Sequence, residues 1–259
     1  MVASLPSDSK PGSASPSGVC AILVDYDNFY VGDPSRREQV RHRVNEMVSL
    51  GLAAAPEANW MQVRLYGGWL QDGLLTNRGS QLQAALGSDY FPRPHPLAPG
   101  LLRGDVSLVT RLIAVPRLEW GHTFRVRRGL PSLRLAEKPR PDGCAHSVSC
   151  PIDHLRRISR RSSGLCPAEA CTATNADAFV VHEQKMVDTL LCCDALALAE
   201  QGSTIVVLSD DLDILPAVAM ATTRATEQVV LVRSSDVAES LYRTELLELG
   251  VAQQAWTEA

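Results

Sequence analysis

The sequence predicts an α/β protein with a mostly parallel central sheet and helices on both of its faces. Short apolar runs, such as residues 19–24 and 204–208, alternate with longer amphipathic segments at both ends of the chain. Runs of this kind are typical of buried strands, and strands that alternate with helices favour a parallel sheet. Acidic residues directly follow these two runs. They would therefore lie at the sheet edge where ligands bind.

The elements are expected in the following order. Strands are predicted at residues 19–24, 60–66, 106–115, 204–208 and 229–233. Helices are predicted at residues 36–50, 76–86, 214–224 and 237–249, and an amphipathic segment from Glu183 becomes a helix that ends at Glu200. Gly51 and Gly202 are interpreted as helix stops. Residues 123–135 predict a β-hairpin around Gly129-Leu130-Pro131, and the four prolines and two glycines of residues 91–105 predict a loop.

Length and composition indicate a globular protein. The 259 residues are 45% hydrophobic and 21% charged, which fits one large domain or two small ones. No apolar run approaches the roughly 20 residues that cross a bilayer, so no membrane contact is expected. Residues 1–18 are rich in Ser, Pro and Gly and predict a disordered leader, with the functional domain at residues 19–259. The leader does not resemble a signal peptide, so a cytoplasmic location is expected.

Charge is distributed unevenly along the chain. Residues 117–161 hold 11 Lys and Arg against 4 Asp and Glu, a balance of +7, which leaves −11 for the rest of a chain of net charge −4. Such asymmetry favours a polyanionic partner. The candidate nucleic-acid-binding residues are Arg125, Arg127, Arg128, Arg156, Arg157, Arg160 and Arg161. A basic surface insertion, around residues 117–175, without a ligand is the alternative.

Acidic residues follow the first predicted strand. Asp25 comes directly after it and is a candidate metal ligand, with a turn or helix-capping role as the alternative. Asp27 would share a face with Asp25 in extended geometry and is an additional candidate. Asn28 would either orient Asp25 or cap the next element.

The strongest single signal follows the strand at residues 204–208. Asp211 and Asp213 are candidate ligands there, Asp210 is an additional candidate, and Ser209 is a supporting residue. One of these acids could instead cap the helix near Ile214, but that role accounts for one acid and not for three.

A further acid interrupts the apolar face of a predicted helix. Asp188 lies beside Val187, and a buried carboxylate is costly unless it is paired or binds a metal. Lys185 is three residues earlier on the same helix face, so a surface salt bridge is the alternative. Asp194 is six residues further along and points elsewhere, which makes it the weakest candidate.

Carboxylates that converge in this way require a compensating charge, and Mg²⁺ or Mn²⁺ with their preference for oxygen ligands would supply it. Ions held by carboxylates bind phosphate oxygens and activate water. The pattern therefore predicts a metal-dependent hydrolase of phosphodiesters.

Four stretches together resemble the NYN domain, a branch of the PIN-like metal-dependent ribonucleases. They are residues 22–29, 185–188, 206–213 and the strand near Val229. The resemblance implies a three-layer α/β/α sandwich and an endoribonuclease whose Mg²⁺ or Mn²⁺ is bound, in catalysis, by Asp25, Asp188, Asp211 and Asp213. By the same resemblance, Asn28 corresponds to the asparagine that accompanies the first metal-binding acid of the family. Ile214 stands where an aromatic residue is common, and residues 91–175 are longer than the compact family core requires.

Two alternative functions stay open. Asp25 and Asp27 after a strand also resemble a haloacid-dehalogenase-like phosphatase, although Phe29 stands where Thr or Val is usual. The other alternative is a non-catalytic module that binds RNA or protein. A homo-oligomer is a further candidate state of the chain.

Four cysteines form two pairs in the basic insertion. They are Cys144, Cys150, Cys166 and Cys171, with gaps of five and four residues. Four thiolates suit a structural Zn²⁺ that would order a segment with few apolar residues. The gaps are wider than usual, and free cysteines or a disulfide are the alternatives.

Overall fold

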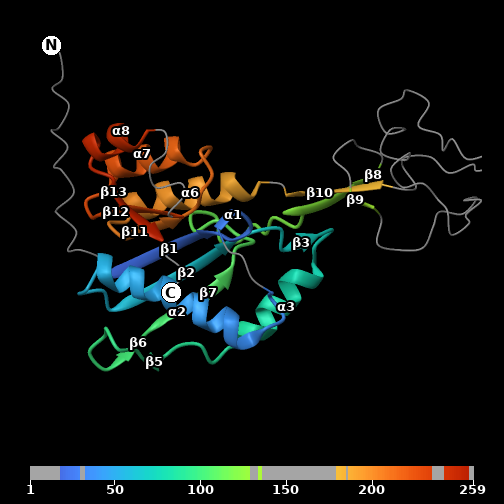
Figure 1. Ribbon diagram of the computed structural model, residues 1–259, viewed down its shortest axis with the longest axis horizontal. Coiled ribbons are helices and arrows are strands. Elements are labelled where there is room, and N and C mark those ends of the chain that lie inside the picture. Colours follow the sequence, from blue (N-terminus) through green and yellow to red (C-terminus); the bar gives the residue numbers. More distant parts are fainter. Residues whose placement is uncertain are drawn as a thin grey trace, which may run out of the picture.

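A six-stranded parallel sheet forms the centre of the protein. The computed structural model describes residues 18–29, 33–128, 134–135, 179–184, 186–234 and 242–256. The strands of the sheet stand in the order β13-β12-β11-β1-β2-β7, and all neighbouring pairs are parallel (Figure 1). Their bounds are β1 Val19–Asp25, β2 Trp60–Tyr66, β7 Gly104–Leu108, β11 Thr204–Leu208, β12 Val229–Ser234 and β13 Ala252–Trp256. The predicted α/β class with a mostly parallel sheet is confirmed.

The chain builds this sheet outward from β1 in two directions. It first adds β2 and β7 on one side of β1, and later adds β11, β12 and β13 on the other side. Strands β1 and β11 are therefore neighbours at the point where the winding reverses, with Val24 beside Leu208. A crevice opens at the carboxyl ends of two strands at such a point, because the segments that follow them leave in opposite directions.

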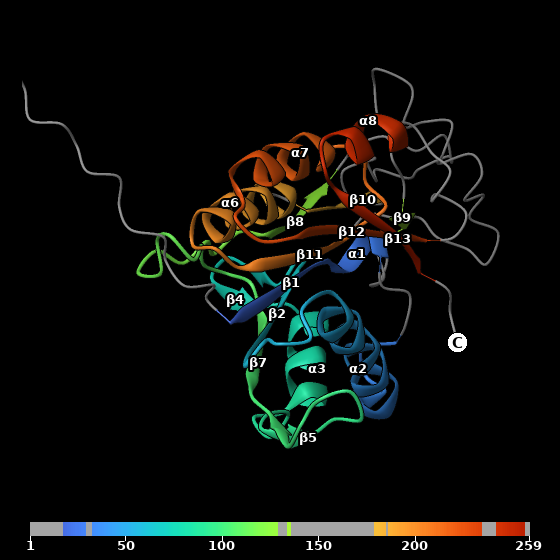
Figure 2. The same ribbon diagram turned by 90° about the vertical axis from the view of Figure 1, so that its left-hand side faces the viewer.

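Helices cover both faces of the sheet (Figure 2). On one face lie α2 Arg37–Ala54 and α3 Asn77–Leu86, and on the other lie α6 Val187–Glu200, α7 Leu215–Arg224 and α8 Arg243–Glu248. Successive side chains of β1 point to opposite faces of the sheet, and each face has its own apolar core. Ile22 and Val24 pack on the side of α2, whereas Ala21 and Leu23 pack on the side of α6. Every residue of β1 from Cys20 to Asp25 is consequently buried.

Several predicted boundaries are confirmed, because the local sequence determines them. Strands β2 and β11 begin and end at the predicted residues, and α3 begins after Thr76, whose hydroxyl accepts a hydrogen bond from the Gly79 amide. The predicted helix stop at Gly51 is wrong, since α2 continues to Ala54. A Cβ at Gly51 would lie 2.7 Å from Ile22 Cδ1, so this glycine allows the helix to approach the sheet closely.

Other expectations were wrong because they depended on distant partners. The helix expected from Glu183 begins at Val187, since β10 Phe179–Gln184 precedes it and Met186 between them is left-handed at φ 63°. The third strand ends at Leu108 instead of at residue 115. The last helix was expected at residues 237–249, and α8 Arg243–Glu248 lies within this range. Strand β13 was not predicted, because its Gln-rich sequence lacks an apolar pattern.

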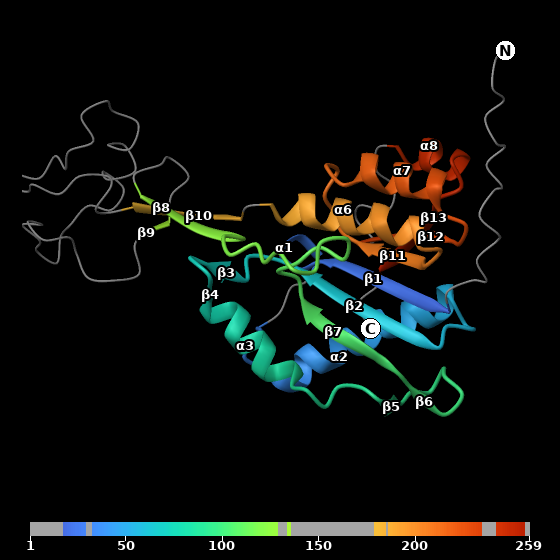
Figure 3. The same cartoon turned by 180° about the vertical axis from the view of Figure 1, so that it is seen from behind.

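The predicted hairpin at residues 123–135 is also wrong. Its two strands, β8 Phe124–Arg128 and β9 Arg134–Leu135, do not pair with each other, because β10 lies between them and pairs antiparallel with both. This small sheet, which we call the ribbon, projects past the carboxyl ends of β1 and β2 (Figures 1 and 3).

Short strands and a short helix complete the described elements. They are α1 Tyr26–Phe29, β3 Leu70–Gln71, β4 Leu74–Leu75, β5 Arg93–Pro94 and β6 Leu101–Leu102. The last two form a small pair inside the predicted loop at residues 91–105. In the described part of the chain, no helix combines the length and the apolar character that spanning a membrane requires.

The substitution Gly104→Ala is expected to lower the free energy of unfolding by about 2–3 kcal/mol. Gly104 begins β7, and an added Cβ would overlap the backbone carbonyl oxygen of Met61 in β2. Gly51→Ala is expected to cost less, because its neighbours are movable side-chain ends and alanine favours a helix by about 1 kcal/mol. Urea unfolding of both variants measures the difference. Equal stability of Gly104→Ala and the wild type would contradict the close approach of β7 to β2.

Candidate metal centre

Three elements bring carboxylates to the reversal point of the sheet. Asp25 is the last residue of β1, Asp211 follows β11, and Asp188 lies in the first turn of α6. One oxygen from each of these three side chains lies within 4.8 Å of the other two. We call this group the carboxylate cluster. The three residues were proposed as ligands from the sequence, and the fold places them together although 186 positions separate the first from the last.

The three carboxylates differ in their exposure to solvent. Asp25 is 1% exposed, Asp211 is half-buried and Asp188 is exposed. The cluster therefore has a buried base at Asp25 and opens to solvent on the side of α6. A ligand could enter from that side.

Two neighbouring side chains hold one oxygen of Asp25. The Ser209 hydroxyl donates to Asp25 Oδ2 at 2.8 Å, and the Asn28 amide donates to the same oxygen at 3.0 Å. Asn28 also donates to Asp211 Oδ2 at 3.3 Å, so it links two members of the cluster. Both residues were expected to support the site, and they contact the predicted ligands.

The other oxygen of Asp25 has no such donor. Asp25 Oδ1 is buried and has no hydrogen-bond partner among the described residues. A buried carboxylate oxygen without a partner is costly. A cation bound between the three side chains would satisfy it, since hard divalent ions take oxygen ligands. The donor set therefore fits Mg²⁺ or Mn²⁺.

The electrostatics of the cluster also favour a cation. Burial raises the pKa of Asp25, and the charge of Asp211 adds to this, whereas the hydrogen bonds from Ser209 and Asn28 lower it. Burial also raises the pKa of Asp188, together with the charges of Asp25, Asp211 and Asp213. Each ionised carboxylate thus makes the next one harder to ionise, and a bound divalent cation would remove that cost.

Comparisons of this chain with protein-family models, with curated proteins and with solved structures find no match. The function is therefore argued from the chemistry of the site.

The segment after β11 is folded as a tight turn. The Asp211 amide donates to Ser209 Oγ at 3.0 Å, and the Asp213 amide donates to Asp211 Oδ1 at 2.9 Å. These bonds orient the Asp211 carboxylate. Asp213 is exposed and lies outside the three-oxygen cluster, but its charge raises the pKa of Asp188. Helix α7 has Ile214 as its N-cap, with no side-chain hydrogen bond, so the capping role considered for these acids is not observed.

The two additional candidates lie outside the cluster. Asp27 was expected to share a face with Asp25, but the chain turns into α1 at Tyr26 and loses the extended geometry. The Asp27 carboxylate instead forms an ion pair with Arg78 of α3 and accepts a hydrogen bond from the Gly68 amide at 3.3 Å. No local sequence signal identifies Arg78, because this contact joins segments about 50 residues apart.

Asp210 supports the loop after β11. Its Oδ1 accepts a hydrogen bond from the Ser234 amide at 2.8 Å, and its backbone carbonyl accepts one from Arg233 at 3.0 Å. These contacts tie the loop to the end of β12. Asp194, the weakest candidate, is fully buried on α6 and pairs with Arg64.

Other predicted site residues fall outside the described residues. These are Lys185, Arg156, Arg157, Arg160, Arg161, Cys144, Cys150, Cys166 and Cys171. Arg125, Arg127 and Arg128 belong to β8, of which the backbone is described.

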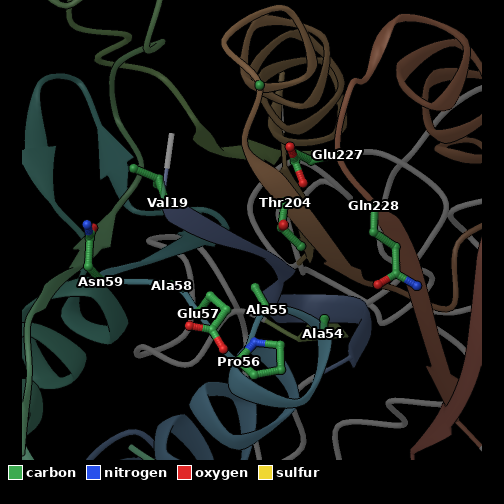
Figure 4. Close-up of a pocket in the computed structure, with 12 residues that line it drawn as sticks. Val19, Ala54, Ala55, Pro56, Glu57, Ala58, Asn59, Thr204, Glu227 and Gln228 are labelled. Atoms are coloured by element: carbon green, nitrogen blue, oxygen red, sulfur yellow. The ribbon is translucent and has the colours of Figure 1, made fainter. Parts of the chain in front are cut away.

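A separate pocket of about 510 Å³ lies at the opposite edge of the sheet (Figure 4). It is bounded by the starts of β1 and β11 and by the loop after α2, and the side chains of Glu57 and Glu227 line it. The carboxylate cluster lies at the carboxyl ends of the same two strands. Since ligands of open parallel sheets bind at the carboxyl edge, we assign the site to the cluster.

The metal-free Asp188→Asn variant is expected to melt about 1–3 °C above the wild type at neutral pH. The pKa of Asp188 is raised in the folded protein, so ionisation costs stability when the pH exceeds its ordinary pKa of 3.8. The gain should disappear as the pH falls below that value, because the carboxyl group is then protonated in both states. Melting curves in EDTA across this pH range measure it.

The control for this experiment is Glu57→Gln, which removes an acidic charge at the opposite edge of the sheet. It should leave the melting temperature unchanged. A gain that is equal in both variants, or that persists at acid pH, would show that the carboxylates of the cluster do not repel one another.

Proposed function

We propose that the protein is a metal-dependent endoribonuclease that hydrolyses RNA phosphodiester bonds at the carboxylate cluster. One observation carries the proposal: three carboxylate oxygens lie within 4.8 Å of one another at the reversal point of a parallel sheet, and the buried Asp25 Oδ1 has no hydrogen-bond partner among the described residues. Such a group is suited to bind a divalent cation.

The residues of the site would act as follows. Asp25, Asp188 and Asp211 would hold Mg²⁺ or Mn²⁺, and the negative charge of Asp213 would add to theirs. The ion, when bound, polarises the phosphodiester and promotes attack by water. Ser209 and Asn28 donate to Oδ2 of Asp25 and so fix the orientation of its carboxylate, whose Oδ1 has no hydrogen-bond partner among the described residues. Asp213 is exposed and is suited to accept a proton from the attacking water.

The ribbon supports a nucleic acid as the substrate. Strands β8 and β10 pair with each other, and the pair Phe124 and Gln184 stands at the base of the ribbon. Strand β10 then leads into α6 just before Asp188. A Cβ on Gly68 would lie 2.8 Å from the Phe124 ring, and the Gly68 amide donates to Asp27. The base of the ribbon is therefore close to the carboxylate cluster. Its outer strand β8 has the sequence Phe-Arg-Val-Arg-Arg, which suits a phosphate backbone.

The two alternatives account for fewer of these contacts. A haloacid-dehalogenase-like phosphatase would use Asp27 as an acid beside the Asp25 nucleophile, but Asp27 is engaged by Arg78 and Gly68. A non-catalytic module would have no need of three converging carboxylates, since their mutual repulsion costs stability without a bound ion.

Further expectations belong to the same proposal. A three-layer α/β/α architecture of the NYN or PIN-like type, a cytoplasmic location, a structural Zn²⁺ in the cysteine-bearing insertion and a homo-oligomeric state stay predictions from the sequence.

The purified protein is expected to cut labelled RNA in the presence of Mg²⁺ or Mn²⁺ and to stop when EDTA is added. Asp25→Asn and Asp211→Asn should each lower the rate on the order of 100-fold or more, because each removes a ligand charge. Glu57→Gln is the control and should cut at the wild-type rate. Gel assays with RNA and DNA of equal sequence measure both activity and preference.

Cleavage that withstands EDTA and both substitutions would refute the metal-dependent mechanism. Hydrolysis of a generic phosphomonoester without cleavage of nucleic acid would favour the phosphatase. RNA binding without any turnover would favour the non-catalytic module.

The double substitution Arg125→Gln/Arg127→Gln is expected to weaken RNA binding and to reduce its dependence on salt. Each phosphate contact to a single strand contributes about 0.7 to the slope of log K against log salt, so the slope should fall by about 1.4. Binding is measured in an Asp25→Asn background to prevent cleavage. The control is Arg103→Gln/Arg224→Gln, which changes two arginines far from the ribbon. An equal change of slope in both double variants would show that the ribbon is not part of the RNA-binding surface.

A further inference from the structure

A buried ion pair that the proposed chemistry does not use anchors the helix that bears Asp188. Asp194 lies on α6 with 0% exposure, and its carboxylate accepts four hydrogen bonds. Three reach Oδ2, from Arg64 Nε at 3.2 Å, Arg64 Nη2 at 2.7 Å and the Tyr66 hydroxyl at 2.8 Å. The fourth reaches Oδ1, from the Ile113 amide at 2.8 Å. We call these residues the α6 anchor.

The α6 anchor joins three parts of the fold. Arg64 and Tyr66 belong to β2, which neighbours β1, and Arg64 also donates to the Arg111 carbonyl at 2.9 Å. Arg111 and Ile113 belong to the segment between β7 and β8. Burial and the charge of Asp194 raise the pKa of Tyr66 well above its ordinary value, so its hydroxyl stays a donor.

Asp188 depends on the backbone of α6 for its position. No hydrogen bond or ion pair with another described residue holds its carboxylate, in contrast to Asp25 and Asp211. The remaining contacts of α6 are mostly apolar, from residues such as Leu190, Leu191 and Leu198. Apolar contacts are not directional, so they permit small rotations and shifts of a helix. A buried polar network with full hydrogen bonding permits only one arrangement.

We infer that Asp194, Arg64 and Tyr66 are positioning residues that set the rotation and height of α6 and so place Asp188 opposite Asp25 and Asp211. The inference rests on the proposed function, since it concerns the same metal centre. Six residues separate Asp194 from Asp188, a distance of about 9 Å along the helix. A helix of regular hydrogen bonding transmits the position of one end to the other over this length. The segment that leads to the ribbon is held by the same carboxylate.

The test removes one oxygen atom from the α6 anchor. Tyr66→Phe is expected to weaken Mn²⁺ binding by roughly 3- to 30-fold. Binding is measured by electron paramagnetic resonance on the full chain without substrate. Tyr90→Phe is the chemically matched control, because the Tyr90 hydroxyl is buried on the opposite face of the sheet and has no hydrogen-bond partner among the described residues. It should bind Mn²⁺ as the wild type does.

A second control separates positioning from stability. Val44→Ala removes apolar side-chain atoms from the core under α2, far from α6. Its Mn²⁺ affinity is compared with that of Tyr66→Phe at a temperature where the two variants have the same folded fraction. The inference requires that Val44→Ala keeps wild-type Mn²⁺ affinity. Equal affinities of Tyr66→Phe and Tyr90→Phe, or an equal loss in Val44→Ala, would overturn it. A wild-type protein that binds no Mn²⁺ would overturn the proposed metal centre itself, which makes the two failures distinguishable.

Discussion

The mutual repulsion of carboxylates at one edge of the sheet is the constraint on which the rest of the structure depends. Asp25 ends a strand whose residues from Cys20 onward are buried, so the Asp25 carboxylate is shielded from water and its ionised form is disfavoured. Asp188 and Asp211 lie close enough for their charges to act on one another. The apolar cores on the two faces of the sheet hold these backbones in place, and their packing supports an arrangement that the charges alone oppose.

Neighbouring polar groups divide the acidic residues into two kinds. Asp27 and Asp210 accept hydrogen bonds from backbone amides at the ends of β2 and β12, and Asp27 also pairs with Arg78. They hold the loops beside the carboxylate cluster in place. Asp25 receives donors on one oxygen only, and Asp188 receives none from another described residue, so these carboxylates keep oxygens for an ion. Hydrogen bonding therefore separates Asp25 and Asp188 from these structural acids, whereas Asp211, which accepts bonds on both oxygens, belongs to the cluster by its position.

The topology of the chain brings the base of the ribbon close to the carboxylate cluster. The winding reverses between β7 and β11, and the ribbon and the insertion occupy this interval. Strand β10 ends at Gln184, and α6 begins at Val187, one residue before Asp188. A polyanion that follows the ribbon would thus approach the carboxylate cluster, where an ion would offset its charge.

The sequence by itself determined the class of fold and pointed to carboxylates that the fold brings together. Apolar runs bounded by polar residues located β1, β2 and β11, since strand burial depends on local composition, and the acids after them indicated Asp25 and Asp211. Tertiary structure decided the rest. The pairing of β8 with β10, the continuation of α2 past Gly51 and the partners of Asp27 and Asp194 all depend on contacts between distant segments, which no local pattern encodes.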